Sequence, residues 1–378
     1  MATIDFNKAK LAWTLSWDSG WVTAVSFLGD SRRLAAGNNQ GDILIWDLPE
    51  KQGSPAPMPS HWLKGHQNCV ARLQCTTDGR TLLSASYDHS IRRWDTDGKQ
   101  SSKGAVLLNA SPIADHEAAE RRGRARKEAP RPVQAEVAVH EAAQVLNAHR
   151  EWVNVLTLSH DQRVVVSGDD AGTVIVWERA TMKEQRRWQV KGWVHAAALA
   201  PDRRQAVVSE RIPLYADANT HYGLKLWDVA RGEIAHDLAE ALKNGNGSQT
   251  PAISAAAYSL DGSVLALGQG GGSNSSGGAL CLVDPATRKK IRDLTPPHQY
   301  GVTDLAFHPD GKHLASAGRD TKVHIWNVAT GKLVTTIGTS RGTANGWDWL
   351  HAISFSPDGH WLAAADMGGL VQIWSLPG

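Results

Sequence analysis

Short apolar stretches recur along the chain, and each is followed by an acidic turn and by a second stretch rich in small residues. The seven copies of this pattern are Val25–Gly37, Leu73–Ala85, Leu156–Gly168, Ala197–Ser209, Ala256–Gly268, Leu305–Ala317 and Ile353–Ala365. Each copy has an aspartate in its turn, at Asp30, Asp78, Asp161, Asp202, Asp261, Asp310 and Asp358. Short strand-like stretches joined by turn residues, without a helical period between them, predict antiparallel β-sheet. One such unit cannot bury its apolar faces alone, so neighbouring units are expected to stack.

A third apolar stretch follows each copy and usually ends in tryptophan. The endings are ILIWD at Trp46, IRRWD at Trp94, VIVWE at Trp177, LKLWD at Trp227, LCLVD at Val283, VHIWN at Trp326 and VQIWS at Trp374. The Trp-Asp dipeptides among them, with Gly65-His66 ahead of the second unit, resemble the WD-repeat (WD40) β-propeller family over nearly the whole chain. The resemblance implies an all-β fold, a seven-bladed β-propeller with four strands in each blade.

The segment Leu11–Trp17 (LAWTLSW) also alternates like a strand, and it precedes the first full unit. The last apolar stretch of the chain is the third strand of unit seven. We therefore expect the ring to be closed by the N-terminal strand, which completes the last blade and removes the unpaired edges of an open array. Residues 1–378 are expected to form a single WD-repeat domain.

Two units carry all four polar groups that resemble the internal network of the family. The second unit has His66, Ser84 or Ser86, Asp88 and Trp94, and the sixth has His298, Ser316, Asp320 and Trp326. Other units lack members, since Gln40 and Ala171 occupy the aspartate position. A buried indole N–H needs an acceptor, and the sets recur by blade, so we interpret them as a structural network and not as hydrolase triads.

A charged insert over residues 97–141 is predicted between blades two and three, because this interval is about twice as long as most of the others. Its middle, Ser111–Pro130, is interpreted as a short helix or a mobile tract. Ala105–Asn109 and Gln144–Ala148 are alternative strands ahead of unit three, and the second is preferred because it adjoins His149. The insert then follows the third strand of blade two, on the face opposite the usual binding face. Its basic run either contacts an acidic partner or nucleic acid, or is solvated and balanced by glutamates; it comprises Arg121, Arg122, Arg124, Arg126 and Lys127.

The family resemblance places the start of each innermost strand at the top rim of the central channel, where partners usually dock. The candidate partner-binding residues at this rim are Trp21, Trp152, Trp193 and Trp349, with Asn154, His195 and His351 just inside and Tyr87 and Arg319 on the same face. Indoles supply rigid apolar area with one donor, which is typical of interface hot spots. The alternative is that these side chains only cover the edge of the neighbouring blade.

Three long connections are expected on the same face, Arg211–Tyr222, Gln269–Gly278 and Gly338–Gly346. The second of them (QGGGSNSSGG) is not a phosphate-binding loop, because it lacks the Lys-Ser/Thr ending and no helix start follows it. Loops on this face can lengthen without disturbing the core, which is where binding functions are commonly added.

The charge balance of 40 Lys and Arg against 38 Asp and Glu gives no basic field, so binding to nucleic acid or to a membrane is not expected. Three cysteines, the absence of a signal-like start and the absence of a long apolar run favour a soluble cytoplasmic protein. The prediction is a non-catalytic scaffold that binds a peptide or partner protein on the top face, without cofactor or metal; the sequence does not indicate an oligomeric state. The alternative is a propeller enzyme or a small-ligand or metal-binding protein with its site at the channel mouth. Its candidates are His195, His351 and Asp304, which lack the spacing of metal ligands.

Overall fold

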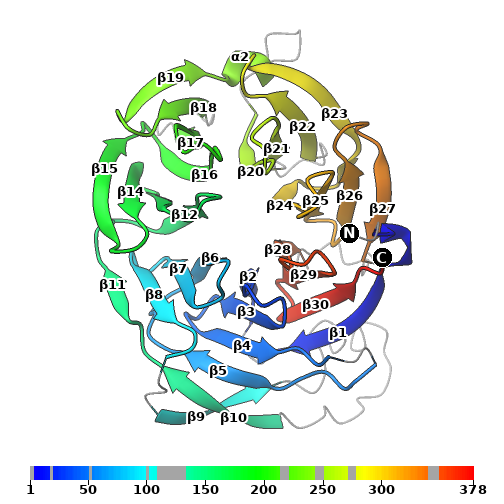
Figure 1. Cartoon of the computed structure of the whole chain (residues 1–378). Coiled ribbons are helices and arrows are strands. Elements are labelled where there is room, and N and C mark those ends of the chain that lie inside the picture. Colours follow the sequence, from blue (N-terminus) through cyan, green and yellow to red (C-terminus); the bar gives the residue numbers. More distant parts are fainter. Residues whose placement is uncertain are drawn as a thin grey trace, which may run out of the picture.

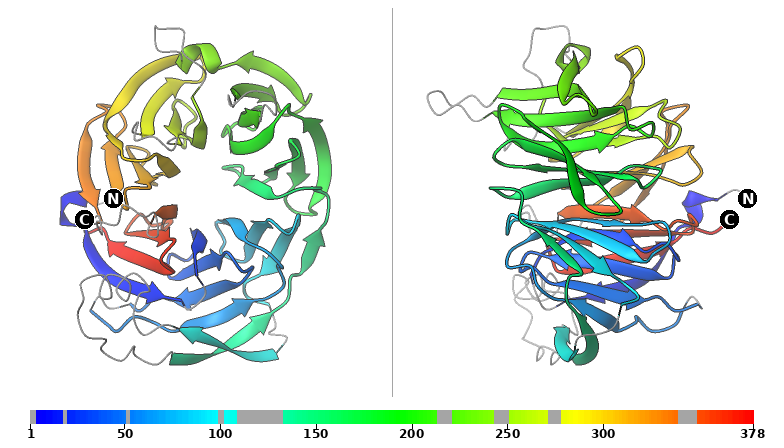
Figure 2. Two further views of the ribbon diagram at one scale, coloured as in Figure 1. Left: turned by 180° about the vertical axis from the view of Figure 1, so that it is seen from behind. Right: turned by 60° about the vertical axis from the view of Figure 1, so that its left-hand side comes forward.

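A computed structural model describes residues 4–17, 20–50, 53–98, 102–108, 133–212, 221–242, 251–270, 278–338 and 349–378. Seven sheets stand around a central channel like the blades of a propeller (Figure 1). Figure 2 shows the ring from behind and from the side, with the N- and C-terminal ends close together. The predicted all-β, seven-bladed architecture is confirmed.

Each blade contains four strands that run in sequence order from the channel outward, except that the outer strand of blade seven comes from the start of the chain. The innermost strands are β2 (Val22–Phe27), β6 (Val70–Cys75), β12 (Val153–Leu158), β16 (Trp193–Leu199), β20 (Ile253–Tyr258), β24 (Val302–Phe307) and β28 (Leu350–Phe355). The second strands are β3 (Arg33–Asn38), β7 (Thr81–Ser86), β13 (Val164–Asp169), β17 (Gln205–Ile212), β21 (Leu265–Gln269), β25 (His313–Gly318) and β29 (Trp361–Asp366).

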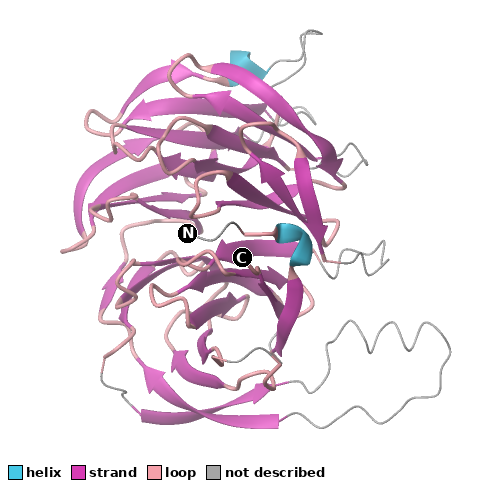
Figure 3. Cartoon of the chain, turned by 45° about the vertical axis from the view of Figure 1, so that its right-hand side comes forward, coloured by secondary structure: helices cyan, strands magenta, loops and turns pink. Residues whose placement is uncertain are grey.

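The third strands carry the tryptophans identified in the sequence. They are β4 (Ile43–Asp47), β8 (Ile91–Asp95), β14 (Thr173–Glu178), β18 (His221–Asp228), β22 (Gly278–Asp284), β26 (Val323–Asn327) and β30 (Leu370–Ser375). The outer strands are β5 (Pro59–Leu63), β11 (Gln144–Leu146), β15 (Lys183–Gln189), β19 (Glu233–Asp237), β23 (Lys289–His298), β27 (Leu333–Ile337) and β1 (Lys10–Ser16). Two short helical turns, η1 (Phe6–Lys8) and α2 (Ala239–Leu242), complete the described part of the chain, which is otherwise strand and loop (Figure 3). No described helix is long and apolar enough to cross a membrane.

The ring is closed as the sequence predicts. Strand β1 pairs antiparallel with β30, with Leu15 opposite Val371 and Ser16 opposite Leu370. The two ends of the chain are therefore joined in one blade, and pairing hides the outer edge of β30 that would otherwise be open.

The same hydrogen bond shapes the turn between the first and second strands of every blade. Oδ1 of each of the seven turn aspartates accepts a hydrogen bond from the backbone N–H two residues later. The residue after each aspartate has a φ between 58° and 78°, and four of these seven residues are glycine. An aspartate followed by a left-handed residue reverses the chain at low cost, which explains why this acidic turn recurs.

The four-residue networks form as predicted in blades two and six. In blade two, His66 contacts Asp88 through Nδ1 at 2.8 Å and Ser84 through Nε2 at 2.7 Å, and Trp94 Nε1 donates to Ser84 Oγ at 2.8 Å. Ser84 is thus the member of the network, whereas Ser86 Oγ donates to a backbone carbonyl.

Blade six has the same geometry with its own four residues. His298 contacts Asp320 at 3.0 Å and Ser316 at 2.8 Å, and Trp326 donates to Ser316 at 2.9 Å. Both sets are buried, apart from their aspartates.

Blade three contains a third network, so the expectation that only two units carry one is wrong. His149 contacts Asp169 at 2.8 Å and Ser167 at 2.7 Å, and Trp177 donates to Ser167 at 2.8 Å. Asp169 lies at the end of the second strand and replaces the turn position held by Ala171. Asp169 stands two residues before Ala171, and its carboxylate reaches the Nδ1 atom of His149, which is the atom that the aspartate contacts in blades two and six.

The predicted insert contributes an extra hairpin to blade one. Strands β9 (Ser102–Leu108) and β10 (Val133–His140) pair with each other, and β10 pairs in parallel with β5, which gives a six-stranded sheet. The chain enters this hairpin after β8 and leaves it before β11, so the insert interrupts blade two between its third and fourth strands. Strand β11 confirms that Gln144–Ala148 contains the outer strand of blade two. The middle of the insert, including Ser111–Pro130 and its basic run, lies outside the described residues.

Candidate partner-binding rim of the central channel

The rim of the channel is built by the same backbone contact in successive blades. The residue that follows the second strand donates its N–H to the carbonyl at the start of the innermost strand. The donor and acceptor pairs are Asn39 and Trp21, Tyr87 and Cys69, Asp170 and Trp152, Gly270 and Ala252, Arg319 and Gly301, and Met367 and Trp349. In blade four the corresponding residues, Trp193 and Arg211, are cross-strand neighbours. The strand register therefore places two residues of each blade at the rim, one at the start of the innermost strand and one at the end of the second strand.

A cavity of about 400 Å³ opens inside this rim, and we call it the rim cavity. All nine residues that the sequence singled out for partner binding line it, namely Trp21, Tyr87, Trp152, Asn154, Trp193, His195, Arg319, Trp349 and His351. The sequence register was sufficient to place them together because each innermost strand starts at the same height. The long connections expected beside them fall almost wholly outside the described residues.

Aromatic rings at the rim make three close contacts. Tyr87 stacks on Trp152, with ring centroids 4.8 Å apart and an interplanar angle of 8°. The Arg211 guanidinium lies 5.2 Å from the Trp193 ring, and the Arg319 guanidinium lies 4.7 Å from the Trp349 ring. Trp21 and Trp152 remain 39% and 46% exposed. The rim thus presents indole surface that is held in place and still reachable.

Residues one step inside the rim tie neighbouring blades together. Thr23 Oγ1 donates to the Val70 carbonyl at 2.7 Å, and Ser254 Oγ donates to the Val302 carbonyl at 2.6 Å. His195 Nδ1 lies 3.1 Å from the Ile253 carbonyl, so this nitrogen must carry the proton. His195 therefore fixes blade four against blade five, and only its Nε2 remains as an acceptor.

Three buried polar atoms of residues that line the rim cavity, Arg211 Nε, Thr303 Oγ1 and His351 Nε2, have no hydrogen-bond partner among the described residues. Burial lowers the pKa of His351 to about 4 and also lowers the pKa of His195, so both rings are neutral at pH 7. Burial and the neighbouring Asp169 raise the pKa of Asp170 to about 6. Asn154 Nδ2 donates a hydrogen bond to Asp170.

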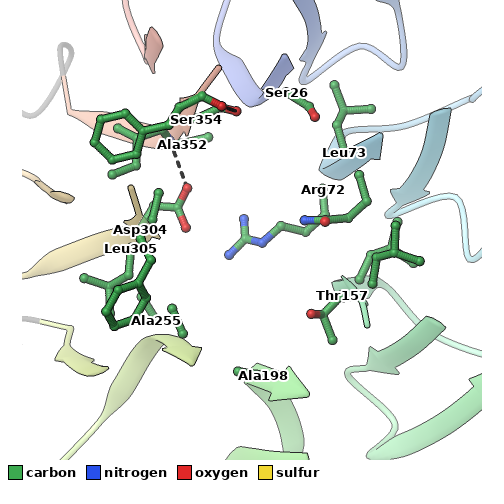
Figure 4. Close-up of a pocket in the computed structure, with 18 of the residues that line it drawn as sticks. Ser26, Arg72, Leu73, Thr157, Ala198, Ala255, Asp304, Leu305, Ala352 and Ser354 are labelled. Carbon is green, nitrogen blue, oxygen red and sulfur yellow. Dashed lines mark hydrogen bonds between the residues drawn. The ribbon is translucent and has the colours of Figure 1, made fainter. Parts of the chain in front are cut away.

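A second cavity of about 460 Å³ continues along the channel, and its walls are the middle and lower parts of the innermost strands. Arg72 lines both cavities and extends into the open space toward Asp304 (Figure 4). Asp304 Oδ2 accepts a hydrogen bond from the Ile353 N–H at 2.9 Å, and burial raises the pKa of this carboxyl. Asp304 lines this second cavity, whereas His195 and His351 line the rim cavity. The three candidate catalytic or metal-binding residues therefore do not share one cavity.

In the described part of the chain, the one group of three residues with metal-ligand geometry is His298, Asp320 and His324. Both ring nitrogens of His298 already contact Asp320 and Ser316. His324 stacks on His298 with ring centroids 4.1 Å apart. The side chains of His298 and Asp320 are therefore already engaged in the structural network of blade six.

Sequence reasoning missed three charged residues of the rim cavity, Arg72, Arg211 and Asp170. Arg211 and Asp170 hold the rim position that Tyr87 and Arg319 hold in other blades, so the repeat register contained the signal. Arg72 lies on β6 itself, where an arginine facing the channel leaves no pattern in the sequence.

Five segments of the chain match the sequence profile of the family described as WD domain, G-beta repeat, and together they cover more than half of it; they are residues 9–47, 58–95, 141–178, 288–327 and 336–375. The chain is 28% identical over 313 residues to apoptotic protease-activating factor 1 of Rattus norvegicus, which covers 81% of this chain and 19% of that protein. It is 22% identical over 300 residues to small ribosomal subunit protein RACK1 of Candida albicans, and this alignment covers 68% of this chain and 92% of that protein. It is 20% identical over 334 residues to RACK1 of Drosophila melanogaster, and this alignment covers 85% of this chain and 97% of that protein. The chain thus spans about a fifth of the rat relative's length. The closed ring of seven blades and the five matching repeats together show that this chain belongs to the WD-repeat family.

Proposed function

We propose that this protein is a non-catalytic interaction scaffold that binds a peptide segment of a partner protein at the rim cavity. The observation that carries the proposal is the set of four rim tryptophans around one opening, two of them more than a third exposed. Buried in an interface, an indole contributes a large apolar area at little entropic cost. A cytoplasmic location is part of this proposal.

The names of the relatives support a role that involves other macromolecules. One is named as a protease-activating factor and two are named as small ribosomal subunit proteins, so by their names one acts on a protease and two are components of the ribosome. Propellers of one architecture bind many different partners, so the kind of partner is inferred from the residues of the rim and not from the fold.

The test replaces Trp193 and Trp349 with alanine in one protein and compares its partners with those of the unaltered chain by affinity capture from the native cell. Losing one buried hot-spot indole typically costs about 2 kcal/mol or more of binding energy, so capture should fall at least tenfold. Ile234→Ala, at an exposed apolar residue of the outer strand β19, is the control and should capture normally. Full retention of partners by a folded double variant would contradict the proposal.

A further inference from the structure

The second cavity of the channel contains two opposite charges that do not pair. Among its described lining residues, Arg72 is the one lysine or arginine and Asp304 is the one carboxylate. In the described part of the chain these two side chains form no ion pair, although Arg203 and Asp161 on the surface do. Both side chains face the open space of the channel (Figure 4). The cavity therefore holds a cation and an anion with space between them.

The strand register puts both charges at the same level of the channel. In every blade the pairing of the two inner strands skips one residue near the start of the innermost strand. The residue after the skipped one lines the second cavity in all seven blades, namely Ala24, Arg72, Val155, Ala196, Ala255, Asp304 and Ala352. Five of the seven are small and apolar. The two charges lie on blades two and six, on opposite sides of the ring.

Neither charge is neutralised by the described part of the protein. Arg72 donates a hydrogen bond to the Ala71 carbonyl at 3.0 Å, and a guanidinium has five N–H donors. Asp304 accepts hydrogen bonds from backbone N–H groups, of which that of Ile353 lies at 2.9 Å. Burial raises the pKa of Asp304, while the charge of Arg72 acts in the opposite direction, so Arg72 is close enough to influence Asp304.

The two charges are not needed to build the ring. Taking a charge out of water without a counter-charge beside it destabilises the folded state. The other five blades form the same register with alanine or valine at this position. An arginine and an aspartate at this level therefore carry a cost in stability that the architecture does not explain.

The space around the two charges suits a small molecule. The cavity measures about 460 Å³, and its walls at the level of the charges are otherwise alanine and valine. Apolar walls with a few placed polar groups are typical of sites for small molecules. The second cavity shares Arg72 and Ser254 with the rim cavity, so a molecule that enters at the rim reaches the charges.

We propose that the channel binds a small amino acid zwitterion, with its carboxylate on Arg72 and its ammonium group on Asp304. Such a ligand carries both counter-charges in one molecule, whereas an ion of one sign would leave the other charge of the channel unpaired. Each end forms charge-assisted hydrogen bonds, and the carbon atoms of the ligand pack against the alanines. The site goes beyond the proposed function and does not depend on it, because no rim tryptophan lines this cavity.

The first experiment titrates the intact protein with leucine, β-alanine and γ-aminobutyrate in a calorimeter. These zwitterions differ in the separation between their two charges, and at least one of them should bind. Its N-acetyl form has no ammonium group and its amide form has no carboxylate. Each of these forms should bind about tenfold more weakly or worse, which corresponds to losing one charge-assisted contact. If none of the three zwitterions binds, or if either derivative binds as tightly as its parent, the proposal is wrong.

Matched variants assign each end of the ligand to its residue. Arg72→Gln should remove the advantage of the zwitterion over its amide form and keep its advantage over the N-acetyl form. Asp304→Asn should do the reverse, and its amide oxygen still accepts the Ile353 N–H. Arg231→Gln and Asp293→Asn, at exposed charged residues of the outer surface, are the controls and should bind as the unaltered protein does. Unchanged selectivity in the Arg72→Gln and Asp304→Asn proteins would overturn the assignment.

Urea unfolding of the same variants separates binding from architecture. Because burial disfavours the ionised form of Asp304, Asp304→Asn should leave the free energy of unfolding at pH 7 unchanged or raise it. A loss of stability in Asp304→Asn with unaltered affinity for the zwitterion would mean that the two charges brace the ring across the channel and bind nothing. The ligand series on the unaltered protein decides the proposal even if a variant does not fold.

Discussion

Three left-handed residues at the acidic turns are not glycine, and each of them reaches the turn of the preceding blade. Ser31 Oγ accepts the Asp358 N–H at 3.0 Å, Gln162 Oε1 accepts the Thr77 N–H at 2.8 Å, and Arg203 pairs with Asp161 at 3.1 Å. A side chain in this backbone region costs about 1 kcal/mol. The contact between blades offsets this cost, so glycine is retained where no such contact is made.

The buried indoles show how a single residue decides whether a blade has its network. In blade three, Trp177 donates to Ser167. In blade four, valine occupies the aligned position at Val208, and the Nε1 atom of Trp227 has no partner among the described residues. A hydroxyl is thus needed at this one position to satisfy the indole.

Replacing Ser167 with alanine should therefore destabilise the protein by about 2 kcal/mol. The change leaves both the Trp177 N–H and a ring nitrogen of His149 without a partner in a fully buried site. Urea unfolding followed by tryptophan fluorescence measures the loss. Ser102→Ala, at an exposed residue of β9, is the control and should unfold as the original protein does. Equal stability of the two variants would show that the network is dispensable.

The hairpin β9–β10 has a buried face that is part of the apolar cluster around the strand that closes the ring. Val106, Leu108, Ala135 and Val137 belong to the same buried apolar cluster as residues of the closing strand β1. The indole of Trp13 on β1 also donates to the Ser54 carbonyl of the loop before β5 at 3.0 Å. The insert of blade two, paired to blade one, therefore belongs to the same apolar cluster as the strand that closes the ring.

Val137→Asp should lower the midpoint of thermal unfolding by several degrees, because it places a carboxylate in this apolar cluster and removes a buried valine worth about 2 kcal/mol. Leu107→Asp is the matched control, since Leu107 lies on the same hairpin and is 55% exposed. Differential scanning calorimetry checks both proteins. A Val137→Asp protein that melts like the control would mean that the hairpin does not brace the ring.

The sequence predicts the regular elements well and the exceptions poorly. Seven registers agree with one another, so strand order, the closing strand and the rim positions follow from the repeat. The insert does not repeat, so no other unit indicates the strand Val133–His140 (VQAEVAVH), although its apolar residues alternate like a strand. Pairing of β10 with the distant β5 is a tertiary contact that no local pattern encodes. The Arg211 and Asp170 side chains were missed because rim residues vary in type from blade to blade.

At the scale of the whole molecule, burial of histidines makes stability depend on pH. The pKa of His61, His66, His140, His195, His324 and His351 is lowered, in each case first by burial. Below pH 6.5 these residues take up protons more readily in the unfolded chain than in the folded ring, where the pKa of His324 and of His351 is lowered to about 4. Protons then favour unfolding, so the free energy of unfolding falls as the pH falls from about 6.5 toward 4.

His324 offers the sharpest test of this linkage, because its pKa is lowered to about 4 and its ring is only 5% exposed. Its Nδ1 has no hydrogen-bond partner among the described residues, and the ring stacks on His298. His324→Phe keeps the stacked ring and removes the proton site, so it should flatten the loss of stability between about pH 6.5 and pH 4 by about 2 to 3 kcal/mol. Urea titrations across this range, with His360→Gln at an exposed histidine as the control, measure the slope for each protein. A His324→Phe protein whose stability falls as steeply as that of the unaltered chain would place the origin of the pH dependence elsewhere in the ring.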